Sequence, residues 1–159
     1  MSCPGNIAYV DGGPGTISAA RGRGYRAALR HHGIEANARV VPGGLSQEHG
    51  TAAAHALLAE GRLPTAIVAF NDDVAAGLTD TFFRAGLTTP RVSIVGWDDS
   101  SLSRLPHLDL TTIRQDADRM TRLAVRRAAA RIAGEKIDDR ELVLPPYLIV
   151  RGSTGPVGG

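Results

Sequence analysis

Hydrophobic residues recur along this chain in two patterns: short runs rich in β-branched residues, and longer stretches in which apolar positions repeat at helical spacing. The short runs predict strands at about 7–10, 38–41, 65–70, 92–96 and 110–114. The longer stretches predict helices at about 17–32, 47–60, 72–85 and 116–133. Strands that read as continuous apolar runs are typical of parallel sheets covered on both faces. The pattern therefore predicts an α/β fold with a mostly parallel sheet flanked by helices.

Glycine and proline mark the ends of these elements. A glycine follows each predicted helix, where the left-handed conformation is inexpensive for it; these are Gly33, Gly61, Gly86 and Gly134. Pro145-Pro146 divides residues 141–150 into two extended pieces, which favours an edge strand. The tail after Arg151 is rich in glycine and proline and is expected to be disordered.

Length and composition narrow the function classes. A chain of 159 residues with 43% hydrophobic residues is long enough for one domain that buries roughly 70% of its unfolded surface. The formal charge of +2 is too small, and the arginines are too dispersed, to indicate a nucleic-acid surface by itself. Cys3 is the only cysteine, so neither a disulfide framework nor a cysteine zinc site is expected. The N-terminus lacks a secretory signal pattern and no apolar run could span a bilayer, so a soluble cytoplasmic protein is expected.

Polar side chains follow two of the predicted strands directly. Asn71 and Asp72 come after the strand at 65–70, and Asp98 and Asp99 come after the strand at 92–96. Ligands of open α/β sheets bind outside the carboxyl ends of the strands. A small polar ligand is therefore expected at this edge.

Structural roles compete with this interpretation. Asn71 or Asp72 could cap the following helix, Asp99 could cap the next turn, and Asp73 could favour the helix dipole. For this reason Asp72, Asp73 and Asp99 are left out of the primary site.

Other chemical motifs are weak. The adjacent His31 and His32, and the pair His49 and His55, do not have the spacing of a helical metal site, so no metal is expected. The glycine-rich turn at 12–15 lacks the phosphate-binding fingerprints. No nucleophile elbow is present either, so we expect neither an enzyme nor a cofactor.

Five motifs in order give a family resemblance. They are PTAIVAFNDD (64–73), GL (86–87), VSIVGWDD (92–99), LTTIRQD (110–116), and LPP (144–146) with VRGST (150–154). Together with ARGRGY (20–25), this series resembles the C-terminal part of LacI/GalR (lactose-repressor) family transcription regulators, over about residues 7–154.

The resemblance implies a truncated, type I periplasmic-binding-protein-like lobe. Residues of about 5–114 and 140–152 would form the C-terminal lobe, and the helix at 116–133 would normally belong to the other lobe. That helix is then expected to be mobile or docked on a neighbouring chain. The DNA-binding domain would be absent, so operator DNA would be contacted only through that missing N-terminal domain.

The resemblance also implies a site for a sugar-like effector. Sugars present hydroxyls that donate and accept, so charged and amide groups beside an apolar wall suit them. The matching positions are Arg21, Asn71, Asp98 and Gln115, with Leu45 as the apolar wall. Trp97 is expected to pack beside the cleft rather than stack on the ligand. The competing interpretation of Arg21 is a solvated helix residue.

Three leucines in the long loop suggest a contact between two copies. Leu102, Leu105 and Leu108 interrupt an otherwise polar segment, and the resemblance places a homodimer contact in this region. The alternative is that they cap the sheet edge within one chain. A second functional class with the same fold, the periplasmic sugar-binding protein of an ABC transporter, is less consistent with the VGWDD and RGST motifs. We expect the chain alone neither to bind operator DNA nor to hold an effector tightly.

Overall fold

Six strands form one sheet in the order β2-β1-β3-β4-β5-β6, in a computed structural model that describes residues 6–87, 91–137 and 141–156. The strands are β1 (Ile7–Val10), β2 (Arg39–Val41), β3 (Ala66–Ala69), β4 (Ser93–Trp97), β5 (Thr111–Arg114) and β6 (Tyr147–Ile149). The first five are parallel, and β6 runs antiparallel along the outer edge of β5. The carboxyl ends of β1 to β5 therefore meet at one edge.

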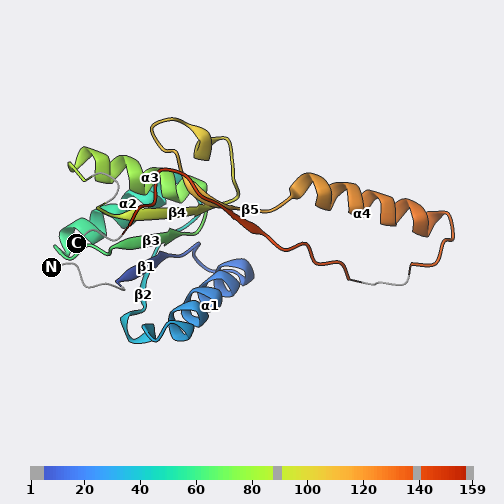
Figure 1. The fold of residues 1–159 in the computed structure, drawn as a ribbon, viewed down its shortest axis with the longest axis horizontal. Coiled ribbons are helices and arrows are strands. Elements are labelled where there is room, and N and C mark those ends of the chain that lie inside the picture. Colours follow the sequence, from blue (N-terminus) through green and yellow to red (C-terminus); the bar gives the residue numbers. More distant parts are fainter. Residues whose placement is uncertain (1–5, 88–90, 138–140, 157–159) are drawn as a thin grey trace.

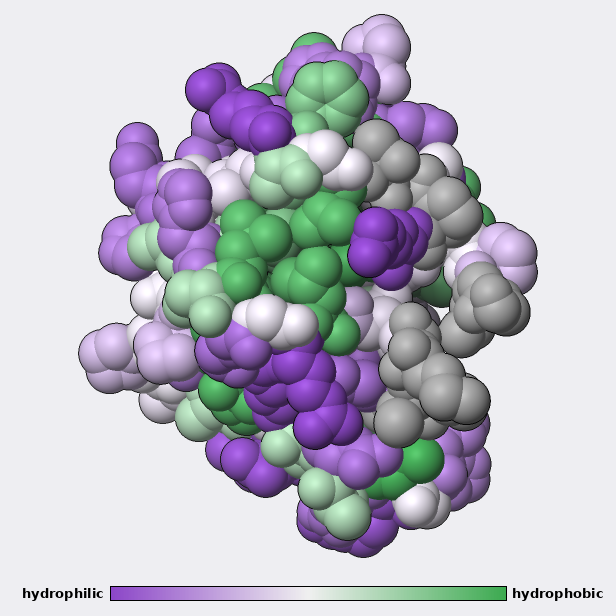
Figure 2. Space-filling model, turned by 90° about the vertical axis from the view of Figure 1, so that its left-hand side faces the viewer, coloured by the Kyte–Doolittle hydropathy of each residue, from purple (hydrophilic) through white to green (hydrophobic). Residues whose placement is uncertain are grey.

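Helices cover both faces of this sheet (Figure 1). The helices of the chain are α1 (Thr16–His31), α2 (Gln47–Ala59), α3 (Asp72–Arg84) and α4 (Ala117–Ile132), with short 3-10 turns η1 (Glu35–Asn37) and η2 (Leu102–Arg104), and the first three cover the sheet. The helices α2 and α3 lie on one face and α1 lies on the other, whereas α4 extends away from the body (Figure 1). Figure 2 shows the body from the end opposite α4, where hydrophobic residues gather near the middle of the visible surface.

The alternation of side chains along β1 explains the two layers of the core. Ala8 and Val10 point into the larger cluster beneath α2 and α3. Tyr9 points to the opposite face, where it stacks on Tyr25 of α1 with ring centroids 5.5 Å apart. The hydroxyl of Tyr25 donates a hydrogen bond to the carbonyl of Ile7 at 2.7 Å, so α1 is tied to the sheet by a polar contact as well.

Two glycines allow α2 and α3 to pack closely. A Cβ at Gly50 would overlap the carbonyl oxygen of Val74, and one at Gly77 would overlap the carbonyl oxygen of Gln47. The two backbones therefore touch where the helices cross. This close approach fixes the position of α3, whose first turn carries the polar strand-end residues.

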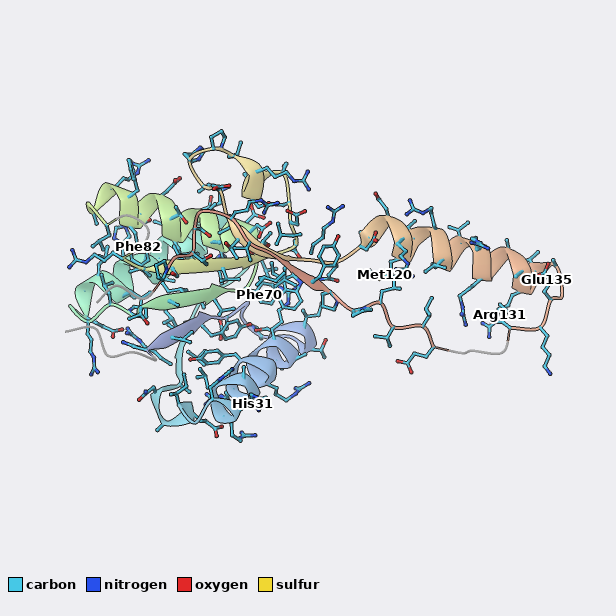
Figure 3. The ribbon with its side chains drawn as sticks, in the orientation of Figure 1. His31, Phe70, Phe82, Met120, Arg131 and Glu135 are labelled. Atoms are coloured by element: carbon cyan, nitrogen blue, oxygen red, sulfur yellow. The ribbon has the colours of Figure 1, made fainter. Side chains whose placement is uncertain are left out.

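No side chain of helix α4 is buried against the sheet. None of its residues is buried. Its apolar side, with Met120 and Leu123, lines a groove of about 590 Å³ together with Leu142 and Leu144 of the returning chain. Figure 3 shows Met120 and Arg131 on the side of α4 that faces this segment. The assignment of residues 116–133 to a different lobe stays a prediction.

The predicted strands and helices lie within two residues of the observed ones, but the C-terminal region differs. Only one extended piece forms a strand, β6, and it is an edge strand as expected. The expected disorder after Arg151 is wrong for Ser153, which is buried and hydrogen-bonded to the carbonyl of Ile94 at 2.6 Å. Cys3 and the last three residues lie outside the described residues.

Candidate functional site

Arg21 is held between two aromatic rings at the carboxyl edge of the sheet. Its guanidinium carbon lies 4.4 Å from the ring centroid of Phe70 and 4.2 Å from that of Trp97. Its Nη1 donates a hydrogen bond to the carbonyl oxygen of Phe70. Only 13% of the side chain is exposed. The alternative that Arg21 is a solvated helix residue is therefore wrong, because its guanidinium makes cation–π contacts with two aromatic rings and little of its side chain is exposed.

Asp98 lies beside this clamped arginine. Arg21 Nη2 and Asp98 Oδ1 are 3.7 Å apart, and 48% of the Asp98 side chain remains exposed. Burial raises the pKa of Asp98, an effect that the positive charge of Arg21 opposes in part. Burial likewise lowers the pKa of Arg21, and Asp98 opposes that change. The pair therefore offers fixed donors next to an accessible carboxylate.

The backbone of Asp98 is in an unusual conformation. Its φ is 111°, a value that L-residues rarely adopt, and Asp99 follows with φ of 48°. Non-glycine residues in such regions are strained and tend to cluster at functional sites. The turn directs the side chain of Asp98 toward Arg21 while Asp99 is turned into the protein.

Asn71 caps α3 and at the same time holds the loop that carries Leu45. Its Oδ1 accepts a hydrogen bond from the backbone N–H of Val74 at 2.9 Å, and its Nδ2 donates to the carbonyl of Leu45 at 2.9 Å. The capping interpretation is thus confirmed. The amide retains one N–H and one lone pair for a ligand, and the side chain of Leu45 is 59% exposed.

Gln115 stands at the end of β5, in the groove that also contains Arg21. Its side chain makes no hydrogen bond to any described residue. The groove has a volume of about 730 Å³ and is lined by Arg21, Trp97 and Gln115 before it continues over Tyr25 toward Leu144. Phe70 lies where the body faces α4 (Figure 3). The structure therefore brings together Arg21, Asp98 and Gln115, with Asn71 and Leu45 as a second pair on the same edge.

The remaining strand-end aspartates are structural. Asp72 is buried and accepts hydrogen bonds from the Thr112 hydroxyl at 2.6 Å and the Ser100 backbone N–H at 2.7 Å. Leaving Asp72 out of the ligand site agrees with this geometry.

Asp99 is the centre of a cluster of arginines. Its carboxylate lies 2.6 Å from Arg151, 3.0 Å from Arg104 and 3.5 Å from Arg114, and its side chain is 2% exposed. Burial would raise the pKa of Asp99, but hydrogen bonds from Arg151, Arg104 and Ser103 hold it below the ordinary value. Arg151 was not predicted from the sequence as a partner of Asp99, since the two are far apart along the chain.

Phe70 was not predicted from the sequence as a site residue, and Trp97 was predicted only to pack beside the cleft. Phe70 directly precedes Asn71, and Trp97 directly precedes Asp98, so each aromatic ring ends a strand just before a polar residue. That repeated order is a signal the sequence does contain. Trp97 packs on Arg21, and its indole Nε1 is buried without a hydrogen-bond partner among the described residues.

The loop leucines do not form one exposed cluster. Leu108 is 5% exposed and belongs to the main core, and Leu102 packs against that core, so their expected exposure is wrong. The alternative, that these leucines cap the sheet edge within one chain, is correct for Leu102 and Leu108. Leu105 alone is exposed, at 38%.

Within residues 6–87, 91–137 and 141–156, no helix is long and apolar enough to cross a membrane. The same residues contain no group of three or more His, Cys, Asp or Glu side chains that could hold a metal ion.

Comparisons with known proteins agree with this architecture. The family described as periplasmic binding protein-like domain matches residues 6–154. The HTH-type transcriptional regulator MalR of Streptomyces coelicolor is 41% identical over 113 residues, which cover 70% of this chain and 32% of that protein.

Two solved structures have the same fold. A LacI transcriptional regulator from a Rhodococcus species is 46% identical with a TM-score of 0.87, covering 96% of this chain and 57% of that chain. The transcriptional regulator CelR in a cellobiose complex is 28% identical with a TM-score of 0.80, covering 94% of this chain and 46% of that chain. The chain thus spans about a third of MalR and about half of these two structures. The chain belongs to the family of periplasmic binding protein-like domains, and within it to the effector-binding domains of LacI-family regulators.

Proposed function

We propose that this chain is the effector-sensing and dimer-forming part of a LacI-family transcriptional regulator, and that its effector is a sugar-like small molecule. The observation that carries the proposal is the clamp of Arg21 between Phe70 and Trp97, beside the exposed carboxylate of Asp98. A planar donor fork next to an acceptor suits the paired hydroxyls of a sugar.

Three further residues complete the proposed site. Gln115 can donate and accept through a side chain that has no partner among the described residues. Asn71 has one N–H and one lone pair left, and Leu45 offers an apolar surface beside it. The cellobiose complex of the related regulator supports a sugar as the ligand class.

The proposed regulator works without catalysis, in the cytoplasm. The effector would lie between this lobe and a second lobe that includes α4, and it would act through its different affinities for two arrangements of the protein. Contact with operator DNA would be made by another part of the regulator. A periplasmic sugar-binding protein has the same fold, but the relative of this chain named above is a transcriptional regulator.

Trp97 is the only tryptophan, so its indole signal can be used to test the proposal. In a two-dimensional NMR spectrum of the 159-residue chain, pentoses, hexoses and disaccharides are titrated and the Trp97 indole N–H is followed. We expect at least one sugar to shift this signal with weak, millimolar affinity, because in this proposal the 159-residue chain supplies one side of the cleft.

Two conservative variants localise the response. Arg21→Lys keeps the charge but loses the planar stack, so it should abolish the shift. Arg26→Lys, on the exposed side of the same helix, should leave it unchanged. The proposal fails if no sugar shifts the indole signal, or if the shift persists in Arg21→Lys.

A further inference from the structure

The carboxylate of Asp98 is presented to Arg21 by a turn that is costly to form. Asp98 and Asp99 have φ angles of 111° and 48°, both in the region that residues with a side chain rarely adopt. Such conformations persist only where the surrounding contacts over-determine them. The contacts that impose this turn therefore also set where the Asp98 carboxylate lies.

Backbone contacts fix the two ends of the turn more firmly than its middle. The N–H of Asp98 donates to a carbonyl of β5 at 2.8 Å, and the N–H of Ser100 donates to the Asp72 carboxylate at 2.7 Å. The N–H of Asp99 reaches the Thr112 hydroxyl only at 3.4 Å, which is long for a hydrogen bond. The side chain of Asp99 is therefore the main remaining anchor for the middle of the turn.

The two oxygens of the Asp99 carboxylate have different partners. Oδ1 accepts hydrogen bonds from Arg151 Nη2 at 2.6 Å and from the Ser103 hydroxyl at 3.1 Å. Oδ2 lies 3.0 Å from Arg104 and 3.5 Å from Arg114. The side chain of Arg151 is 17% exposed, whereas those of Arg104 and Arg114 are 57% and 43% exposed. Arg151 is therefore the inner partner of the carboxylate, and the other two arginines are its outer partners.

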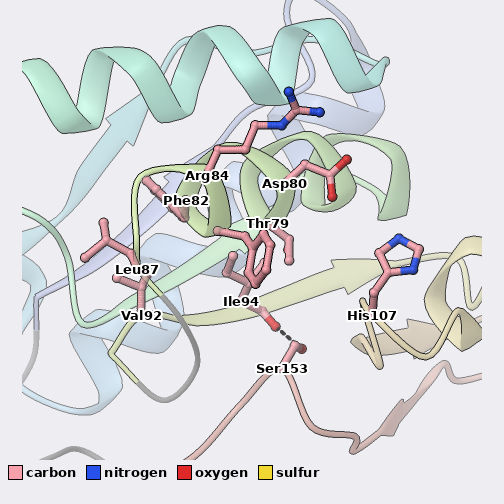
Figure 4. Close-up of a pocket in the computed structure, with 10 residues that line it drawn as sticks. Thr79, Asp80, Phe82, Arg84, Leu87, Val92, Ile94, His107 and Ser153 are labelled. Atoms are coloured by element: carbon pink, nitrogen blue, oxygen red, sulfur yellow. Dashed lines mark hydrogen bonds between the residues drawn. The ribbon is translucent and has the colours of Figure 1, made fainter.

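Arg151 is itself held firmly on the sheet. Its Nη1 donates to the carbonyl of Leu110 at 2.7 Å, and its backbone N–H donates to the Thr111 hydroxyl at 2.9 Å. Two residues further along the chain, Ser153 donates to the carbonyl of Ile94 at 2.6 Å, which ties the same segment to β4 (Figure 4). Arg151 therefore connects the Asp99 carboxylate to the body of the sheet.

We propose that Arg151 is a positioning residue of the effector site. It acts through Asp99, whose side chain holds the turn and so sets the distance of 3.7 Å between Asp98 and Arg21. Arg151 does not line the groove that contains Arg21, so it influences the ligand without contacting it. The inference rests on the proposed function for the identity of the site.

Loss of Arg151 changes the balance of forces on the Asp99 carboxylate. The charged partners that remain are Arg104 and Arg114, both at Oδ2. The carboxylate is then drawn toward them and away from the sheet. The strained turn relaxes as a result, and Asp98 moves away from Arg21. A site whose contacts are loosened in this way loses affinity, because the ligand must restore the geometry when it binds.

A matched pair of substitutions tests the conformation of the turn. Arg151→Met removes a guanidinium from Asp99 but keeps the apolar stem, and Arg104→Met makes the same change at an outer partner. In NMR spectra without sugar, the three-bond coupling between the amide and α protons of Asp98 reports its φ. We expect Arg151→Met to change this coupling and Arg104→Met to leave it at the parent value. A parent-like coupling in folded Arg151→Met, or the same change in both variants, overturns the inference.

The sugar titration followed at the Trp97 indole measures the consequence for binding. Arg151→Met should weaken the affinity on the order of tenfold, and Arg104→Met should change it by less than about twofold. An affinity that is the same in Arg151→Met as in the parent contradicts the proposal. If no sugar shifts the signal of the parent, the proposed function fails, whereas the coupling of Asp98 still decides whether Arg151 sets the turn.

A milder substitution covers the case in which Arg151→Met does not fold. Arg151→Lys keeps the positive charge, but one ammonium cannot reproduce the planar fork that bonds Asp99 and the carbonyl of Leu110 together. We expect a smaller change in the Asp98 coupling, in the same direction. A coupling identical to that of the parent would count against Arg151 as the residue that holds the turn.

Discussion

Replacement by asparagine should destabilise the fold strongly at one of two neighbouring aspartates and very little at the other. Asp98 and Asp99 are consecutive, and both have positive φ angles, a conformation that asparagine tolerates. They differ in their surroundings: about half of the Asp98 side chain is exposed, whereas that of Asp99 is buried among arginines. The two substitutions therefore change the same atoms in two different electrostatic environments.

The contacts of Asp99 set the size of its effect. Arg151 is largely buried and lies 2.6 Å from the Asp99 carboxylate, so removal of that charge leaves a guanidinium without its counter-ion. Breaking a buried ion pair costs about 3–5 kcal/mol. Arg104 and Arg114 are much more exposed and should add little. Because asparagine retains some hydrogen bonding, we expect Asp99→Asn to lower the free energy of unfolding by about 3 kcal/mol.

Asp98→Asn should change the free energy of unfolding by less than about 1 kcal/mol. Burial raises the pKa of Asp98, so the fold favours its neutral form, and the stability due to that form is lost as the pH rises through the raised pKa. Asparagine resembles the neutral form and avoids this loss. The weakened contact with Arg21 opposes the gain, which leaves a small net effect.

The pH dependence gives an independent check. Hydrogen bonds from Arg151, Arg104 and Ser103 outweigh the effect of burial and lower the pKa of Asp99 below its ordinary value of 3.8. Its contribution to stability is therefore present above that value and is lost as the pH falls through the lowered pKa. The parent should lose this contribution in acid, whereas Asp99→Asn lacks it at every pH.

Urea unfolding followed by Trp97 fluorescence measures both effects. With a slope of about 2 kcal/mol per molar urea, Asp99→Asn should lower the midpoint by about 1.5 M at neutral pH. Its deficit relative to the parent should shrink in acid. Equal midpoints for the two asparagine variants, or a deficit that does not depend on pH, would refute the assignment of Asp99 as the buried partner of Arg151.

Two further measurements test the packing of the helices. Gly77→Ala should destabilise the fold by about 2 kcal/mol, because the added Cβ meets the backbone of α2. Gly24→Ala adds a Cβ on open surface and should stabilise the fold by up to about 1 kcal/mol. If the urea midpoints of the two variants do not differ, the close crossing of α2 and α3 is contradicted. In hydrogen exchange, the amides of α4 should exchange far faster than those of α3, because α4 buries none of its residues and an isolated helix of its length is marginal. Equal protection would mean that α4 is packed on a partner in solution.

The sequence was sufficient to predict the elements and the edge of the sheet that carries the site. Strands such as 7–10 are buried on both faces and carry a strong local signal, and glycines mark the helix ends. The position of Asn71 and Asp98 follows from topology, because the carboxyl ends of parallel strands share an edge.

The contacts made by these residues could not be predicted in the same way. Arg21 is separated from Phe70 by 49 residues and from Trp97 by still more, so its clamp depends on the packing of α1 across β1 and β3. The burial of Leu108 and the pairing of Asp99 with Arg151 likewise depend on how a long loop and the C-terminal segment fold back. The sequence shows three leucines in an otherwise polar loop but not the direction in which their side chains point.

The two segments that connect the body to α4 are held firmly just beside the proposed effector site. On one side, Thr112 of β5 is buried and bonded to Asp72. On the other, Arg151 donates to the carbonyl of Leu110 at 2.7 Å and to Asp99. Beyond these anchors the chain continues through Gln115 toward α4, which buries none of its residues.

Any displacement of α4 relative to the sheet must therefore occur close to Gln115 and to the residues before β6. Gln115 lines the same groove as Arg21, and Leu144 and Met120 line its far end. A ligand that binds Arg21 and Gln115 together would contact the body and the connection to α4 at once. Its affinity would then differ between arrangements of α4, and that difference is the physical requirement for an effector to shift an equilibrium. The firm anchors at Thr112 and Arg151 confine the change to this connection, so that the sheet can remain fixed while α4 moves.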